Sequence, residues 1–474
     1  MNNSNIDEKI NARLQKRFFT EMLVTAVANG SDHKKYIEVV KEWAKFFEKK
    51  LRERNLIRKI KHRPKEFWNF KGKKKIYNID GGQLNLGMTG SATMGVRVGV
   101  YKVKPGDYSK ESRESYDDSS TLISNLIDRE KGSHYEDSDD FQLEFKKMLE
   151  GSRMIMELAE AVRQSEAKGI WDDKPSTHDI IFLHGPIIFQ AAMYHLSSDP
   201  NITIPPYKEK FCEKLLAHAP NFNLDIFKNK DKDEEKKIRT FLPLYCELAN
   251  YVKNSKIPIY GVVERSVNVS PGIVTRAMIG ELYQTRERKN VINERNFNWS
   301  WNTDRVSDGS KDGDIALKVF ENYMLGDPNL FDLILDEGEY IVPIQVTKQI
   351  WDKYKSLEYI YRNLFKSMPE PFVTYLKTSE FRKPIRVETL NVRDSFDDDI
   401  DLVFHSAKML PEYAFPLGLD TVDKLAKVPS WMKNSLKNAY QMRMLRAVID
   451  SGNKEWIELG LKSLIPNRNG WNRP

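Results

Sequence analysis

The chain has very little cysteine and no long apolar run. Only Cys212 and Cys246 occur among its 474 residues, which excludes a disulfide framework and a zinc site built from cysteines and suits a reducing cytoplasm. No uninterrupted apolar run approaches the roughly 18 residues that a membrane-spanning helix requires. The N-terminus is polar, with early charges. We therefore expect a cytoplasmic protein without a membrane segment.

Several motifs of nucleotide and hydrolase chemistry are also missing. The sequence contains no Walker lysine motif, no His-Glu-x-x-His, no Gly-x-Ser-x-Gly and no dinucleotide-binding fingerprint. Nucleotide hydrolysis and serine-hydrolase chemistry therefore lack their expected parts.

The composition is that of a globular protein. Hydrophobic residues make up 40% and charged residues 30% of the chain, and 75 basic residues against 68 acidic ones give a net charge of +7. Both signs are abundant, so the total charge alone does not establish a nucleic-acid partner. The length allows two or three domains, or one elaborated α/β domain with insertions.

Apolar periodicity divides the chain into an ordered series of elements. Residues 1–62 have apolar residues at helical spacing and predict two amphipathic helices. We expect a helical N-terminal region over residues 1–70, a main domain over 71–450 with insertions at about 105–140 and 190–256, and a C-terminal tail over 451–474.

The main domain begins with alternating, strand-like residues. Ile76–Asp80 and Met94–Val103 predict an antiparallel hairpin, and residues 105–140 predict an exposed loop with a short helix near Leu122–Ile127. The later predicted elements are a helix over 141–168, strands at 180–186, 257–263, 372–376 and 385–390, and helices over 190–256 and 417–447. This order indicates a mixed sheet with helices on its faces.

Five polar residues stand at the ends or borders of these apolar segments: Asp80, Glu157, His184, Glu264 and Asp423. Each has a structural alternative, since Asp-Gly is a common turn pair and a lone histidine is often a hydrogen-bonded core residue. Carboxylates from strand ends and a helix can also converge at one edge of a sheet, where they bind Mg²⁺ or Mn²⁺ and support phosphodiester cleavage.

Charged neighbours surround two of these positions. Arg153 precedes Glu157 by four residues and Glu160 follows by three, so all three can share one side of the helix, with Glu160 expected as a solvated neighbour. Basic runs at 49–63 and 71–75 fit either a solvated surface or contact with nucleic acid.

Six segments in order carry a resemblance to a known family. They are Ile79-Asp80-Gly81-Gly82, the helix around Glu157, Leu183-His184-Gly185-Pro186, Tyr260 to Ser266, Pro384 to Glu388, and Phe415 to Asp423. Together, over roughly residues 70–450, they resemble the NurA nucleases.

The resemblance implies a ribonuclease H-like α/β fold and a metal-dependent DNA nuclease. It implies that Asp80, Glu157, His184 and Asp423 are catalytic and bind Mn²⁺ or Mg²⁺. Basic residues implied to face the DNA strand are Lys73, Lys74, Lys75 and Arg265. It further implies a homodimer on a HerA-like hexameric ATPase, serving in DNA end resection or in defence against phage.

The sequence departs from the family pattern at four positions. His184 stands where the family usually has an aspartate and Asp423 where it usually has a histidine, as though a carboxylate and an imidazole had exchanged places. Either group ligates Mn²⁺. Phe415 replaces a tyrosine and Glu264 a lysine. The alternative is therefore a catalytically impaired NurA-like scaffold or regulatory subunit of such a motor.

Overall fold

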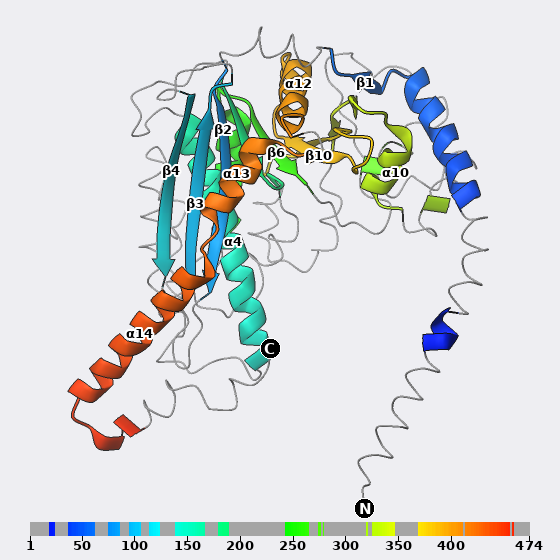
Figure 1. Ribbon diagram of the computed structural model, residues 1–474. Helices are drawn as coiled ribbons and strands as arrows, with labels where there is room; N and C mark the ends of the chain where they lie inside the picture. The colour runs from blue at the N-terminus through cyan, green and yellow to red at the C-terminus, as the bar shows by residue number, and fades with distance from the viewer. Residues whose placement is uncertain are drawn as a thin grey trace, which may run out of the picture.

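The computed structural model in Figure 1 describes just over half of the predicted main domain and parts of its flanks. The described residues are 19–23, 37–61, 74–85, 94–105, 113–123, 138–165, 179–188, 242–264, 274–275, 278, 319–320, 325–346, 368–410, 413–455 and 457–458. The predicted elements between 189 and 241, together with residues 265–273, lie outside this part of the chain.

Ten described strands form a single mixed sheet, ordered β1-β7-β9-β10-β6-β5-β2-β3-β4, with β8 paired to β9. The strands are β1 (Ile57–Lys59), β2 (Ile76–Asn85), β3 (Met94–Val103), β4 (Glu114–Ile123), β5 (Ile180–His184), β6 (Ile259–Val263), β7 (Glu339–Ile341), β8 (Ile344–Gln345), β9 (Phe372–Leu376) and β10 (Ile385–Thr389). The predicted hairpins of β2 with β3 and of β9 with β10 are confirmed.

Half of this sheet has the connectivity of the ribonuclease H-like fold. Strands β2, β3 and β4 form an antiparallel meander, and β5 and β6 continue the sheet beside β2 in parallel orientation. Helix α4 (Ser138–Ser165) lies between β4 and β5 in the chain and α7 (Leu242–Asn254) lies between β5 and β6. A helical crossover between β5 and β6 is what two parallel neighbours require. The predicted fold class is confirmed.

Strand β4 corrects one prediction. Residues 114–123 were expected in an exposed loop, but they pair with all of β3, from Glu114 opposite Val103 to Ile123 opposite Met94. The segment has few aliphatic residues because it is the outermost strand, where side chains meet solvent and polar residues are tolerated.

Two layers of helix enclose the meander. Helix α4 (Ser138–Ser165) packs against β2, β3 and α7 (Leu242–Asn254), whereas α13 (Leu417–Ala426) packs against β2 and β3 from the other face. The alternation of side chains along β2 explains this division. Tyr77 and Ile79 belong to the core under α4, and Asn78 meets α13, where a Cβ at Gly418 would lie 2.3 Å from the Asn78 amide.

The other half of the sheet has its own core. The helix over residues 37–53 and α10 (Asp327–Ile334) bury Phe47, Leu51 and Phe331 against β7, β8 and β9. Residues 57–59, predicted as helix, form β1 and pair with β7. Helix α12 (Phe396–Ala407) joins this half to the core under α13.

The C-terminal helical segment is divided in two. Helix α13 ends at Ala426 and α14 (Ser430–Asp450) begins directly after Pro429, which cannot continue the preceding helix. Figure 1 shows α14 extending away from the sheet, and no residue of α14 is buried. In the described part of the chain, no helix has both the length and the apolar character needed to span a membrane.

Candidate metal centre

Asp80 lies within a strand and not at the turn that its sequence suggested. Strand β2 continues through Gly81 and Gly82 to Asn85, and the Asp80 side chain is buried. One carboxylate oxygen accepts a hydrogen bond from the backbone N–H of Gly81 at 2.8 Å, and the other lies 2.9 Å from Nδ1 of His184. The backbone and the next strand therefore fix the orientation of this carboxylate.

His184 reaches Asp80 because β5 is the parallel neighbour of β2. Ile79 pairs with Leu183, so the next residues of both strands emerge at the same edge. Gly185 then ends the strand with φ of +121°, a conformation that favours glycine. The imidazole packs against the ring of Phe415, with centroids 5.3 Å apart.

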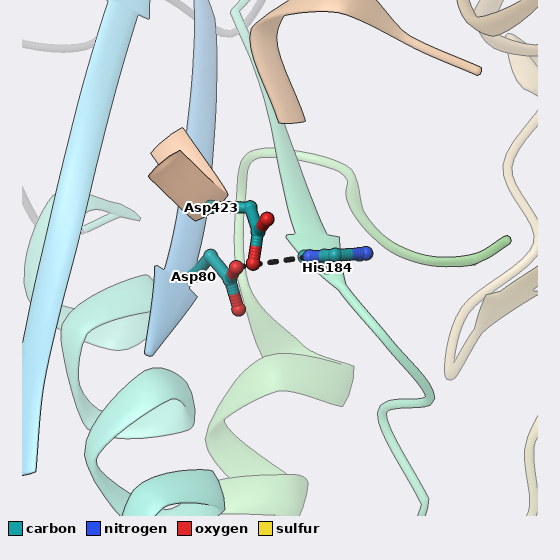
Figure 2. A group of neighbouring side chains, drawn as sticks. All are labelled: Asp80, His184 and Asp423. Atoms are coloured by element: carbon teal, nitrogen blue, oxygen red, sulfur yellow. Dashed lines mark hydrogen bonds and ion pairs between the residues drawn. The ribbon is translucent and has the colours of Figure 1, made fainter. Parts of the chain in front are cut away.

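The electrostatic surroundings of His184 favour its charged form. Burial lowers its pKa, but the hydrogen bond and charge of Asp80, with the charges of Asp423 and Glu157, outweigh burial and raise the pKa above its usual value. Figure 2 shows one ring nitrogen directed toward Asp80 and the other directed away from both carboxylates.

Helix α13 supplies the third group. Its close approach to β2 depends on small residues, since a Cβ on Gly82 would lie 2.2 Å from the carbonyl oxygen of Ala426. This packing places Asp423 beside the two strand residues. One ligand atom each from Asp80, His184 and Asp423 lie within 4.8 Å of one another.

These donors fit a divalent cation of the Mn²⁺ type. Ligand atoms at about 2.2 Å from a common ion lie at most about 4.4 Å apart, so the observed group needs only a small contraction. The two carboxylates suit Mn²⁺ and Mg²⁺ alike, and Mn²⁺ also accepts the imidazole nitrogen. The Nδ1 atom of His184, which faces Asp80, is the nitrogen placed to bind.

Glu157, the fourth predicted ligand, lies beside this group and outside it. Its side chain on α4 meets β2 at Gly81, where an added Cβ would lie 2.5 Å from the Glu157 carboxylate. Arg153 Nη1 lies 2.5 Å from Glu157 and 4.0 Å from the Asp80 carboxylate. Burial raises the pKa of Glu157 to about 7, against the opposing charge of Arg153.

Glu160 differs from its prediction as a solvated neighbour. It is buried on α4, where it forms an ion pair with Arg163 and accepts a hydrogen bond from Gln164 at 2.7 Å. Arg163 also reaches Asp117 of β4 at 3.2 Å. Arg163 therefore connects the buried Glu160 to β4, the strand that the sequence did not indicate.

A pocket of about 430 Å³ lies beside Asp423, one of the three grouped residues. Its lining includes Gly81, Gly82, Arg153, Asp423 and Lys427. The sequence reasoning did not single out Lys427, whose ammonium forms an ion pair with Asp423 one helical turn earlier. The spacing of four residues from an acidic residue on a predicted helix was the available signal.

The predicted DNA-facing residues have varied surroundings. Lys73 and Arg265 lie outside the described residues. The Lys74 ammonium lies 3.1 Å from the buried carboxylate of Asp399, so this charge has a partner within the fold. Lys75 directly precedes β2 and is half-buried. Glu264 follows β6 and is also half-buried.

Comparison with known proteins gives matches among solved structures only. No protein-family model matches the sequence, and no curated protein matches it. The structure of the NurA nuclease from Sulfolobus solfataricus is 11% identical, with 88% of this chain and 95% of that chain covered and a TM-score of 0.44. A structure of NurA with manganese is also 11% identical, with coverage of 87% and 98% and a TM-score of 0.38.

A structure of NurA bound to dAMP and manganese is 13% identical, with coverage of 75% and 85% and a TM-score of 0.31. These proteins belong to the family that the sequence motifs resemble.

Proposed function

We propose that the chain is a divalent-metal-dependent deoxyribonuclease. The observation that carries this proposal is the convergence of Asp80, His184 and Asp423 from three separate elements, within 4.8 Å of one another, beside a pocket with basic side chains. Isolated acidic residues are common on protein surfaces, but a partly buried carboxylate and imidazole group beside a basic pocket suits a cation together with a phosphate.

The residues of the site would have separate roles in metal binding and in proton transfer. Asp80, His184 and Asp423 would hold the cation, which supplies polarisation of a phosphodiester and a more acidic water. Glu157, with a pKa raised to about 7, can take up or release a proton near neutral pH. Arg153 holds Glu157 in place beside Asp80.

The assembly belongs to the same proposal. The chain acts as a homodimer with a HerA-like hexameric ATPase that delivers DNA by translocation, in end processing or in defence against phage. The support for this assembly is the ordered set of sequence motifs shared with NurA. Analytical ultracentrifugation of the chain alone tests the dimer, and comigration with a HerA-type ATPase tests the complex.

The activity is tested with linear DNA, double- and single-stranded, in the presence of Mn²⁺, Mg²⁺ or EDTA, with and without the ATPase. We expect cleavage that requires a divalent cation and falls by at least about 10³-fold in Asp80→Asn, because the central carboxylate is lost. Lys424→Gln, on the same helix as Asp423 but paired with Asp420, is the matched control and should retain full activity.

A non-catalytic subunit is the competing function. Cleavage of equal rate in wild type and Asp80→Asn would mark a contaminating nuclease. No cleavage under any condition, combined with tight binding to the ATPase, would replace the nuclease with a scaffold or regulatory role.

A further inference from the structure

The two basic side chains of the pocket are already paired with carboxylates in or beside the candidate metal centre. Arg153 contacts Glu157 at 2.5 Å and approaches Asp80 at 4.0 Å, and Lys427 forms an ion pair with Asp423. They reach the centre from opposite sides, Arg153 from α4 and Lys427 from the end of α13. Positive charge therefore stands beside every carboxylate that a cation would use.

The charges of this group do not permit simple addition of a cation. Arg153 and Lys427 lie close to the two carboxylates of the centre, Asp80 and Asp423, so a divalent cation placed there would be repelled by both basic side chains. A phosphate bound beside those basic side chains would offset this repulsion, so cation and phosphate together complement the site better than the cation alone.

The positions of Arg153 and Lys427 indicate where their charged ends can turn when they leave the carboxylates. Both line the pocket of about 430 Å³ together with Gly81 and Gly82, where α4 and α13 approach the strand closely. The Lys427 side chain is 64% exposed and that of Arg153 is 29% exposed, so each has room to turn from a carboxylate toward the pocket. Arginine binds phosphate oxygens through two parallel hydrogen bonds, and lysine binds them as a point charge.

We propose that Arg153 and Lys427 are exchangeable counter-ions, which neutralise the carboxylates when no cation is bound and turn to a substrate phosphate in the adjoining pocket when a divalent cation binds. The inference rests on the proposed function for the identity of the substrate. Two properties of binding follow: Arg153 and Lys427 compete with the cation for the carboxylates, and a bound phosphate relieves that competition. Cation and nucleotide therefore bind with positive coupling, which must be equal in both directions.

The test measures Mn²⁺ binding and needs no catalysis. Free Mn²⁺ is titrated by electron paramagnetic resonance with wild type, Arg153→Gln, Arg153→Lys and Lys427→Gln, alone and with thymidine 5′-monophosphate. In wild type we expect the nucleotide to strengthen Mn²⁺ binding by at least about fivefold, and thymidine without phosphate to have no effect.

The variants distinguish the competition with the cation from its relief by phosphate. Lys427→Gln and Arg153→Gln should bind Mn²⁺ alone more tightly than wild type and should lose most of the nucleotide effect. Arg153→Lys keeps the charge but not the planar fork, so its Mn²⁺ affinity alone should match wild type while the nucleotide effect falls. Lys424→Gln, exposed and paired with Asp420 outside the pocket, should behave as wild type in both titrations.

Lys427 is exposed enough for Lys427→Gln to fold normally, which its melting temperature will verify. Mn²⁺ binding that is unchanged or weaker in both Gln variants, with an intact nucleotide effect, overturns the inference, as does a wild type that binds no Mn²⁺. Coupled binding without DNA cleavage would support the exchange of counter-ions and count against the nuclease. DNA cleavage without coupled binding would support the nuclease and count against the exchange of counter-ions.

Discussion

Asp80 connects the parts of the candidate site because its two carboxylate oxygens have different partners. One is held by the Gly81 backbone and the other faces Nδ1 of His184. Asp423 of helix α13 lies beside the same pair. At the residue scale the site is thus a carboxylate, an imidazole and a second carboxylate, and the order of these groups along the chain is less important than their spacing.

This spacing predicts that the second and third groups are interchangeable. His184→Asp leaves three carboxylates together, and Asp423→His leaves two imidazoles and deprives Lys427 of its partner. Each single variant should lose Mn²⁺ affinity, on the order of 10–100-fold. The double variant restores one imidazole and two carboxylates, so its loss should be smaller than the product of the two single losses. Isothermal titration with Mn²⁺ measures all four corners of the cycle.

A double variant that binds as weakly as the product of the single effects would contradict this prediction. His184 would then have a role that depends on its place in β5, such as its hydrogen bond to Asp80. Lys424→Gln provides the baseline for a substitution on α13 that leaves the three groups intact.

The sequence identified the three grouped residues but not the place of Lys427 beside them. Asp80 and His184 follow apolar strand segments, and Asp423 was found through the order of motifs. Lys427 follows Asp423 by four residues, so their pairing is local, but its place beside the site depends on how the end of α13 packs on Gly82, which a single sequence does not state. The spacing of Arg153 and Glu157 likewise allowed their ion pair, whereas the place of Glu157 outside the group of three depends on how α4 packs on β2.

At the scale of elements, strand prediction succeeded where apolar residues alternate or cluster and failed where they do not. The segments at β3, β5 and β9 are rich in Val, Ile and Phe, and all three were predicted. Strand β4 contains Ser, Asp and Glu, because its pairing with β3 provides order that its own composition does not. Strand β2 runs through a glycine pair that indicated a turn.

Helix α12 shows how polar contacts attach the N-terminal strand to the rest of the fold. Arg58 of β1 donates to Asp397 at 2.9 Å, and the Tyr340 hydroxyl of β7 donates to the same carboxylate at 2.8 Å. Burial alone raises the pKa of Asp397, but these hydrogen bonds outweigh it and hold the pKa below its usual value. The ionised carboxylate therefore stabilises the folded state.

The sign of the shift determines a pH dependence. Because the folded pKa of Asp397 is below the unfolded one, its stabilisation is present at neutral pH and is lost as pH falls below about 4, through the folded pKa. Asp397→Asn should lower the free energy of unfolding by about 1–2 kcal/mol at pH 7, since Arg58 is partly exposed. The difference from wild type should shrink as pH falls below about 4.

Urea unfolding at pH 7, 5 and 3 measures this difference. Asp394→Asn, an exposed change three residues earlier, is the control and should have little effect at any of these values. A destabilisation by Asp397→Asn that persists undiminished at pH 3 would show that the side chain acts through packing and not through its charge.

At the scale of the whole molecule, the candidate site joins parts that are far apart in the sequence. Its ligands come from β2, β5 and α13, and the last lies more than two hundred residues beyond the second. Sequence order therefore predicted a mixed sheet with helices but gave no direct measure of this convergence. What brings the three together is the parallel pairing of β5 with β2 and the packing of α13 on the opposite face from α4.

A site assembled in this way exists only in the folded chain, which makes the cation a probe of the entire fold. A ligand that binds the native state alone stabilises it by mass action, by about 2.7 kcal/mol when its free concentration is one hundred times its Kd. Mn²⁺ should therefore raise the melting temperature of the wild type by several degrees in calorimetry. EDTA should reverse the rise, because the effect depends on free cation.

Asp80→Asn and Asp423→Asn should each lose most of this rise, since each removes a ligand from a different part of the fold. Lys427→Gln should show a larger rise than wild type at the same Mn²⁺ concentration, because the cation no longer competes with the ammonium for Asp423. Lys424→Gln should match the wild type. An equal rise in wild type and both Asn variants would mean that Mn²⁺ binds elsewhere, and the three grouped side chains would then be a hydrogen-bonded structural cluster.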